Sequence, residues 1–459
     1  MLTVRLVSIA RIGVLACCLA ALVPPRALAQ ARAGDSDMVK IAEEFAGDVS
    51  DGRYEEAVKR FDEAMAKALP AEKLKEVWES VQTSAGSFES LGKSTTTQSK
   101  GLTTVIIPAV FKKTTLSLSI SVDAEGRIAG FWIRPGGAAA TYAAADYDKP
   151  DRYREKEVEF GEKPWRIKGK LTRPKGVKAA PAVVLVHGSG PHDEDETIGP
   201  NKPFRDLAGG LSSRGIAVLR YQKRTFAHAG ELAKQKTITV REEVIDDALE
   251  ALEFLRKQKG IDKEHIYLLG HSLGGTLAPQ IAAEDKKLAG VILMAGAPRD
   301  FFEVIEEQLT YIASLPGPQQ EANKKGLEEA RQAMASARAP SAPPDLTLLG
   351  VPISYWREVS GYATKSPKVL GGLDCRVMVL GGGRDYQVTR ADFDVYSKAL
   401  KDNAGAKLKW YDNVSHLFVE GKGKSTPAEY AEPNHVSKTV VRDLADWIKG
   451  KGQQAAALS

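Results

Sequence analysis

The chain has 459 residues, of which 43% are hydrophobic, and this composition supports two or three packed domains and excludes a largely disordered protein. Its formal net charge of +5 is small for this length, and no dense Lys/Arg block is present. We therefore expect neither nucleic acid nor an anionic membrane surface as a partner.

The first 29 residues predict a secretory signal peptide. Residues 12–23 form an apolar run of 12 residues, which is shorter than a bilayer span of about 20 residues. An Ala-Leu-Ala cleavage site ends at Ala29. Cleavage would remove three arginines, lowering the charge from +5 to +2, and would leave Cys375 as the single cysteine, which allows no internal disulfide. We expect an exported protein, periplasmic or secreted, that begins at Gln30 and has no stable membrane insertion.

Residues 35–135 predict a small α+β domain. From Asp35 to about Leu91, apolar residues recur every three to four positions, as they do in amphipathic helices. From about Lys93 to Arg134 the pattern changes to alternation, most clearly in "TTLSLSISVD", which is typical of strands. The Ala/Gly-rich stretch 136–150 ends in proline and is interpreted as a linker.

Residues 151–450 predict an α/β fold with a mostly parallel sheet covered by helices. After a predicted hairpin, short apolar runs from "AVVLVHG" to "KLKWYD" alternate with helical segments. Strands that are apolar throughout indicate a parallel sheet buried on both faces.

One segment, residues 299–365, interrupts this alternation with a mostly helical insertion that contains the proline-rich "APSAPPD". We expect a lid over a pocket, although its aromatic residues could equally pack only the insertion's own core. The expected lining residues are Phe301, Phe302, Leu309, Tyr355 and Trp356.

Ser272 lies in the sequence Gly-His-Ser-Leu-Gly, between the predicted strand "HIYLLG" and a predicted helix. Such a turn holds a serine in a strained conformation, and its glycines allow the strand and the helix to approach closely. The helix N-terminus adds partial positive charge where an oxyanion would form. Ser272 is therefore the predicted nucleophile, and the alternative is that it only caps the helix.

A serine nucleophile needs a base and an acid that orients the base. Asp385 follows the predicted strand "RVMVLGG", and His416 lies four residues after "KLKWYD". The order Ser, Asp, His is the one that this architecture requires. The alternatives left open are His192 and His228 for the base and Asp412 for the acid.

The loop that follows "AVVLVHG" predicts an oxyanion-binding element. Its sequence at residues 187–190 is His-Gly-Ser-Gly, which can present the backbone N–H of Ser189 together with that of Leu273. The alternative is a tight turn that merely needs glycine. The acidic run "HDEDE", residues 192–196, is expected to be a solvated loop rather than a metal site, because no second ligand cluster accompanies it.

With these residues assembled, residues 151–450 resemble the α/β-hydrolase superfamily. More narrowly, they are similar to bacterial carboxylesterases related to the serine aminopeptidase and dienelactone hydrolase branches. The stretch "LVHGSGPHDEDETIGPNKPFRDLAGGLSSRGIAVLRYQKRT" carries this likeness. The resemblance implies a serine carboxylic ester hydrolase that forms an acyl-enzyme through Ser272, His416 and Asp385. It implies no cofactor and no metal, and a small-molecule ester as the partner.

Two positions depart from that pattern. The family often has an arginine where this chain has Glu194 and an aspartate where it has Gln222. The N-terminal region resembles a small domain of unknown function, similar in fold to nuclear transport factors. Nothing in the sequence indicates an oligomeric state.

Two other functions stay open. A serine peptidase of the same fold would need a carboxylate to bind a free amine, and the insertion offers Glu303, Glu306 and Glu307. An inactive binding protein is the second alternative, although the complete set of predicted catalytic residues argues against it.

Overall fold

The computed structural model describes residues 35–99, 102–112, 114–135, 142–232, 235, 238–317, 319–339 and 346–450. The predicted signal peptide lies outside these residues, as do positions 136–141 of the predicted linker and positions 340–345 of the proline-rich segment. Within the described chain, one compact unit contains residues 35–135, and a second contains residues 142–315 and 324–450.

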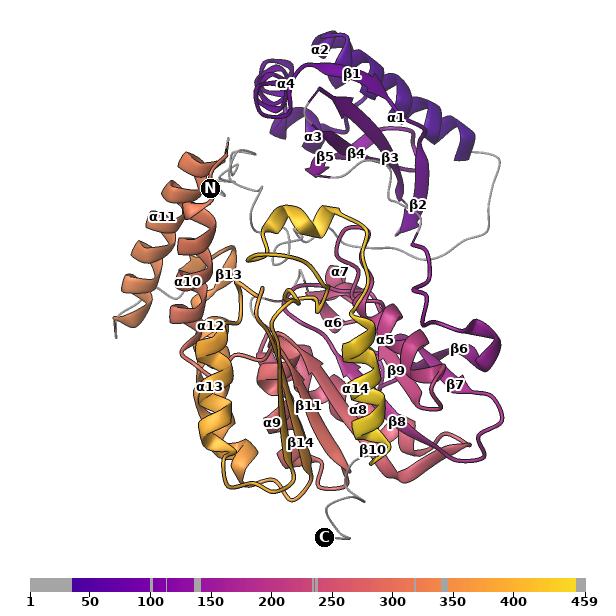
Figure 1. Cartoon of the computed structure of the whole chain (residues 1–459). Coiled ribbons are helices and arrows are strands. Elements are labelled where there is room, and N and C mark those ends of the chain that lie inside the picture. The colour runs from indigo at the N-terminus through magenta and orange to yellow at the C-terminus, as the bar shows by residue number, and fades with distance from the viewer. Residues whose placement is uncertain are drawn as a thin grey trace. The chain divides into compact units, whose positions relative to one another are not determined.

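The first unit consists of helices followed by an antiparallel sheet, which confirms the predicted element order (Figure 1). Its helices are α1 (Asp35–Ser50), α2 (Tyr54–Val58), α3 (Glu63–Ala68) and α4 (Ala71–Ala85). Its strands are β1 (Phe88–Leu91), β2 (Thr95–Ser99), β3 (Leu102–Phe111), β4 (Thr115–Val122) and β5 (Ile128–Pro135). The helical region ends earlier than predicted, because residues 88–91 pair with β3 as a strand.

The core of this unit lies between the helices and one face of the sheet. Phe45 of α1 and Trp78 of α4 are buried, and the Trp78 ring lies 5.4 Å from that of Phe111 on β3. Alternate residues of β3, such as Val105 and Ile107, are also buried in the same hydrophobic cluster. The alternating sequence of the strands therefore directs one face of the sheet toward the helices.

The second unit is built on an eight-stranded sheet in the order β15-β14-β11-β10-β8-β9-β7-β6. Its strands are β6 (Tyr153–Phe160), β7 (Ile167–Pro174), β8 (Ala180–Val186), β9 (Ala217–Tyr221), β10 (Ile261–His271), β11 (Gly290–Met294), β14 (Arg376–Gly382) and β15 (Ala406–Tyr411). Strands β8 to β15 of this sheet pair in parallel, whereas β6 and β7 form the predicted antiparallel hairpin. This arrangement confirms the predicted fold class.

Helices cover both faces of this sheet (Figure 1). Consecutive residues of β10, Tyr267 and Leu268, point to opposite faces, and both side chains are buried. The helical segments between and after the strands of this sheet, apart from the insertion, include α5 (Pro203–Ser212), α6 (Arg224–Ala227), α7 (Ala229–Leu232), the π-helical turn η3 (Arg241–Ile245), α8 (Asp246–Arg256), α9 (Leu273–Glu284), α13 (Arg390–Ala399) and α14 (Lys438–Ile448). No helix in the described ranges is both long and apolar enough to cross a membrane.

The segment between β11 and β14 is the predicted helical insertion. It contains α10 (Phe301–Ser314), α11 (Gln320–Arg338), the short strands β12 (Thr347–Leu348) and β13 (Val351–Pro352), and α12 (Ile353–Gly371). The ring of Phe301 stacks on that of Trp356 with centroids 5.6 Å apart, and Trp356 Nε1 donates to the carbonyl of Leu348 at 2.9 Å. Two of the expected pocket-lining residues therefore pack within the insertion itself, which was the alternative left open by the sequence.

Candidate active site

Ser272 occupies the sharp turn between β10 and α9. Its backbone angles are φ 54° and ψ −115°, a strained conformation that few residues other than glycine adopt. A Cβ atom on Gly274 would lie 2.3 Å from the carbonyl oxygen of Val186, and one on Gly270 would lie 2.1 Å from the carbonyl oxygen of Gly274. These glycines let the helix pack directly against the strand ends, so the turn projects the serine at the edge of the sheet.

The structure brings Ser272, His416 and Asp385 into one hydrogen-bonded chain. Ser272 Oγ lies 3.0 Å from His416 Nε2, and His416 Nδ1 lies 2.7 Å from Asp385 Oδ2. The other carboxylate oxygen, Oδ1, accepts the backbone N–H groups of Gln387 at 2.7 Å and Val388 at 3.0 Å. The carboxylate binds the proton on Nδ1, which leaves Nε2 as the acceptor facing the serine hydroxyl.

The alternative base and acid residues are engaged elsewhere. His192 Nε2 donates to the carbonyl oxygen of Ser189 at 2.7 Å, and His228 Nε2 donates to that of Arg166 at 2.8 Å. Asp412 is exposed, whereas Asp385 is buried beside the imidazole of His416. The geometry thus favours His416 and Asp385 over the competitors that the spacing left open.

The loop after β8 passes directly against the serine turn. A Cβ atom on Gly188 would lie 3.2 Å from Ser272 Cβ, so only glycine allows this approach without displacement. Leu273 is the first residue of α9, and the N–H groups of a first helical turn have no partner within the helix. The predicted oxyanion donors, Ser189 and Leu273, therefore belong to segments that flank Ser272 on adjacent elements.

Three buried or nearly buried side chains hold this loop by its backbone. The N–H of Gly188 donates to Glu196 Oε1 at 2.7 Å, and the carbonyl oxygen of Gly188 accepts from Lys223 Nζ at 2.8 Å. The carbonyl oxygen of Ser189 accepts from His192 Nε2. The loop is thus anchored at successive peptide groups rather than being a free turn.

The acidic run 192–196 is largely buried, so the expectation of a solvated loop was wrong. Asp195 is only 7% exposed and lies 2.8 Å from the guanidinium of Arg220 on β9. Glu194 lies 2.9 Å from Lys170 Nζ on β7. The carboxylates fold inward because cations from distant strands neutralise them, and the local sequence does not show those partners.

The two departures from the family pattern contact each other. Gln222 Nε2 donates to Glu194 Oε2 at 3.3 Å, and Lys170 pairs with the other oxygen of the same carboxylate. Both changes therefore fall on one contact beside the loop, and neither touches Ser272, His416 or Asp385.

Glu196 and His271 form a buried pair that the sequence did not reveal. Glu196 Oε2 lies 2.9 Å from His271 Nδ1 in a geometry unlike that of a linear hydrogen bond, so the attraction is primarily electrostatic. His271 Nε2 donates to the carbonyl oxygen of His416 at 3.0 Å. One pair thus links the loop after β8 to the loop that carries His416. The only sequence signal for this pair was that Glu196 lies within the stretch that carries the resemblance to carboxylesterases.

The charges of this pair shift both pKa values. Burial by itself would raise the pKa of Glu196, but the charge of His271 and those of His192 and His187 outweigh it and lower the pKa to about 2. Burial would lower the pKa of His271, but the charge of Glu196 outweighs it and the pKa is raised. The strained backbone of Glu196, with φ 52°, shows that its surroundings fix its position.

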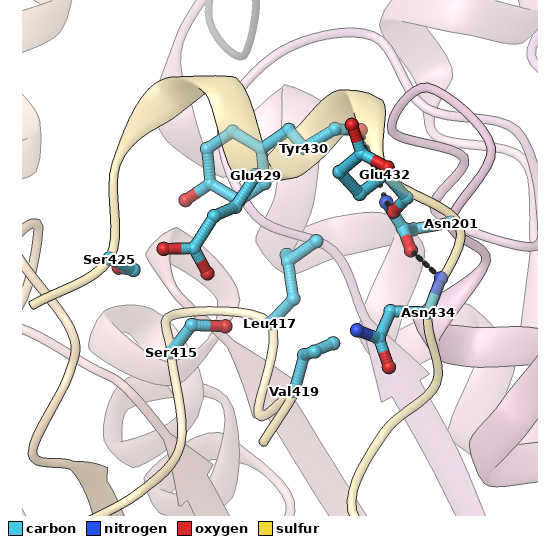
Figure 2. A pocket seen from close by; sticks show the side chains of 9 residues that line it. All are labelled: Asn201, Ser415, Leu417, Val419, Ser425, Glu429, Tyr430, Glu432 and Asn434. Carbon is cyan, nitrogen blue, oxygen red and sulfur yellow. Dashed lines mark hydrogen bonds between the residues drawn. The ribbon is translucent and has the colours of Figure 1, made fainter. Parts of the chain in front are cut away.

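A cavity of about 200 Å³ lies beside the loop that carries His416 (Figure 2). Leu417 and Val419 border it from that loop, and Glu429 and Tyr430 border it from the short helix η4 (Pro427–Ala431). The remaining lining residues are Asn201, Ser415, Ser425, Glu432 and Asn434. Ser272 does not line it, so the cavity adjoins the histidine loop rather than the position where a serine would be acylated.

No group of three or more His, Cys, Asp or Glu side chains in the described part of the chain is arranged to hold a metal ion. Glu194, Asp195 and Glu196 of the run 192–196 form ion pairs with lysine, arginine and histidine side chains.

The sheet, the serine turn and the histidine loop agree with a family model for the alpha/beta hydrolase family, which matches residues 183–432. This match spans more than half of the chain, and the chain belongs to that family. A second model, described as a protein of unknown function (DUF3887), matches residues 42–131, in agreement with the resemblance noted for the N-terminal region.

Among individual proteins, the chain is 36% identical over 404 residues to Esterase EstD from Thermotoga maritima, covering 88% of this chain and 93% of the relative. It is 30% identical over 127 residues to Thiohydrolase aneE from Aspergillus aculeatus, covering 28% of this chain and about a third (36%) of that protein. The solved structure of Est1E from Butyrivibrio proteoclasticus matches 64% of this chain and 98% of its own, with a TM-score of 0.42 and 15% identity.

Proposed function

We propose that the protein hydrolyses carboxylic esters of small molecules through an acyl-enzyme, with Ser272 as the nucleophile, His416 as the base and Asp385 as the orienting acid. The observation that carries this proposal is the continuous chain of contacts from Asp385 through His416 to Ser272 Oγ, at 2.7 and 3.0 Å. The likeness to Esterase EstD over 93% of that relative's length supports an ester as the substrate.

Each step of the reaction then has a group in position. His416 Nε2 accepts the proton of Ser272 Oγ while the oxygen attacks the ester carbonyl carbon. The carbonyl oxygen becomes an oxyanion that the N–H groups of Ser189 and Leu273 stabilise. His416 next transfers its proton to the departing alcohol oxygen, leaving the acyl group on Ser272. A water molecule, deprotonated by His416, then releases the acid and restores the serine.

The pairing of carboxylates in the insertion with arginines favours ester hydrolysis over the peptidase alternative. A peptidase specific for a free amine needs an available carboxylate to bind it. Glu306 accepts a hydrogen bond from Arg331 Nε at 2.9 Å, and Glu307 lies 2.6 Å from Arg299. Two of the three candidate carboxylates are therefore already paired with arginine, and Glu303 is exposed.

Ser272→Ala tests the proposed nucleophile. We expect kcat for p-nitrophenyl esters to fall by about 10⁴- to 10⁶-fold, because the three residues act as one unit. Labelling by a fluorophosphonate probe should disappear, while the thermal midpoint stays close to that of the wild type, because one hydroxyl at the turn creates no large cavity.

Ser314→Ala, on the exposed end of α10, is the control and should retain both activity and labelling. Substantial ester hydrolysis by folded Ser272→Ala would refute the mechanism. Faster turnover of amino-acid p-nitroanilides than of esters would favour a peptidase, and a wild-type chain that neither labels nor hydrolyses would favour a binding protein.

We also propose that the protein is exported, on the basis of the predicted signal peptide. N-terminal sequencing of the mature protein should then begin at Gln30. Recovery of the active protein with Met1 still in place would contradict export by this route.

A further inference from the structure

Lys223 is a buried lysine whose ammonium group touches the candidate oxyanion loop. The residue is only 2% exposed and follows β9 by two positions. Its Nζ donates to the carbonyl oxygen of Gly188 at 2.8 Å and lies 3.2 Å from Glu243 Oε1. A buried ammonium is costly unless it is paired and hydrogen-bonded, and here Glu243 and the loop carbonyl supply both partners.

The contact with Gly188 determines where the next N–H points. The carbonyl of Gly188 and the N–H of Ser189 belong to the same planar trans peptide group, so they point in opposite directions. Holding the carbonyl on Lys223 therefore directs the N–H of Ser189 away from the lysine. The preceding N–H, that of Gly188, is held by Glu196 at 2.7 Å, so the peptide groups on both sides of this residue are oriented.

Glu243 is in turn held by donors other than Lys223. It lies on the π-helical turn η3, and Thr225 Oγ1 donates to its Oε1 at 3.0 Å. The hydroxyl of Tyr355, on α12 of the insertion, donates to its Oε2. The carboxylate that supports the lysine is therefore fixed by two further elements of the second unit.

We propose that Lys223, supported by Glu243, is a positioning residue that orients the Gly188–Ser189 peptide so that its N–H serves as the second donor of the oxyanion hole. The inference rests on the proposed ester hydrolysis. A buried ion pair is weak evidence for a stabilising role, because replacing such pairs by apolar side chains is often neutral or stabilising. A positive charge on the carbonyl side also polarises the peptide and strengthens its N–H as a donor.

The test combines Lys223→Met with Glu243→Gln. Methionine keeps a similar length without the charge, and the double variant avoids leaving a buried carboxylate without its cation. We expect kcat for p-nitrophenyl acetate to fall about 10- to 100-fold, less than the loss typical of removing an oxyanion donor outright, with KM changed by no more than about twofold. Inhibition by a trifluoromethyl ketone, which forms a tetrahedral oxyanion on the serine, should weaken by the same factor as kcat/KM.

Lys170→Met is the matched control, because Lys170 pairs with Glu194 of the same loop at 2.9 Å but contacts neither Gly188 nor Ser189. Its kcat should stay at the wild-type value. If Lys223→Met alone does not fold, the double variant carries the test. A folded double variant with wild-type kcat and wild-type inhibition would overturn the inference, as would a lower thermal midpoint with unchanged kcat. If Ser272→Ala is inactive in the same assay, such a result leaves the proposed ester hydrolysis intact.

Discussion

The loops on either side of Ser272 are held by different kinds of interaction. On one side, Asp385 and His416 form a short chain of side-chain hydrogen bonds that ends at the serine. The oxygen of Asp385 that does not face His416 accepts backbone N–H groups. On the other side, the backbone of the loop after β8 is bound by the buried charges of Glu196 and Lys223. In the mechanism that we propose, the first group of residues supplies the reacting atoms and the second places the backbone donors.

This difference separates chemistry from positioning. Replacing a side chain of the first group removes a proton donor or acceptor but changes the packing little. Replacing one of the second leaves its former partner buried without a counter-charge, which affects stability as well as geometry. The comparison therefore predicts that replacing Asp385 or His416 causes a large loss of turnover with an intact fold. Replacing Glu196 or Lys223 should cause a smaller loss of turnover together with a loss of stability.

Asp385→Asn should give the largest effect of the substitutions that follow. An asparagine amide in this position favours the wrong tautomer of His416, and such a change typically lowers kcat by about 10⁴-fold. The thermal midpoint should change little. Asp412→Asn, in the exposed turn after β15, should keep kcat within about twofold, because surface substitutions rarely have larger effects. Equal losses for the two variants would show that Asp385 has no special role.

The proximity of Ser272, Asp385 and His416 could be predicted from the sequence, because each of these residues follows a recognisable strand. Ser272 lies in a motif whose strand and helix are visible in the local pattern, and the order of the chain places Asp385 and His416 at the same edge of the sheet. Parallel strands present their carboxyl ends together, so local signals suffice.

The positioning side could not be predicted, because its partners are distant in the chain. Asp195 is buried by Arg220, and Glu196 by His271, across separations that no local pattern records. The insertion shows the same limit. Its sequence left open whether Phe301 and Trp356 line a pocket or pack within the insertion, and it did not show that their rings stack, since amphipathic spacing marks an apolar face without identifying its partner.

Gly274→Ala should lower both turnover and stability. The added Cβ would lie 2.3 Å from the carbonyl oxygen of Val186, so α9 and the end of β8 must move apart. We expect kcat to fall about 100-fold, as displacements near 1 Å can do, and the free energy of unfolding to fall by about 1–3 kcal/mol.

Gly326→Ala on α11 is the control, because a Cβ atom added at Gly326 would meet nothing within 4 Å. Alanine in a helix interior is favoured over glycine by about 0.5–1 kcal/mol, so this variant should be at least as stable as the wild type and equally active. Denaturant unfolding and ester kinetics on both variants check these outcomes, and an unaltered Gly274→Ala enzyme would show that the close approach is dispensable.

Glu196→Gln should reduce kcat on the order of tenfold, because the N–H of Gly188 loses a charged acceptor but keeps a neutral one. The backbone of the loop would then be held less firmly, and oxyanion donors contribute less when they are poorly aligned. Its effect on stability should depend on pH. The raised pKa of His271 means that its stabilising contribution is complete below its unfolded pKa and is lost as the pH rises through its folded pKa. Glu196, whose pKa is about 2, contributes above the ordinary value of 4.5 and loses that contribution only as the pH falls toward 2.

The difference in thermal midpoint between the wild type and Glu196→Gln should therefore be largest below the ordinary pKa of histidine and should shrink as the pH rises through the raised pKa of His271. Burial lowers the pKa of His187 to about 3 and also lowers that of His192, so in the wild type these imidazoles lose their protons at lower pH than His271 does. Thermal unfolding across this range measures it, and a gap that stays constant with pH would show that the pair is not ionised in the folded protein.

Tyr355→Phe should have the smallest effect, because it removes one hydroxyl at the end of the contacts that lead from the insertion to the loop after β8. Glu243 would lose one donor and keep Lys223 and Thr225, so the lysine should remain close to Gly188. We expect a loss of about 1 kcal/mol in the free energy of unfolding, typical of one hydrogen bond, and a decrease in kcat of about two- to threefold with KM unchanged. Tyr362→Phe, on the same helix but without a bond to Glu243, should leave kcat at the wild-type value. A Tyr355→Phe enzyme that loses as much turnover as the Lys223→Met/Glu243→Gln variant would mean that the insertion, rather than the buried lysine, sets the orientation of the loop.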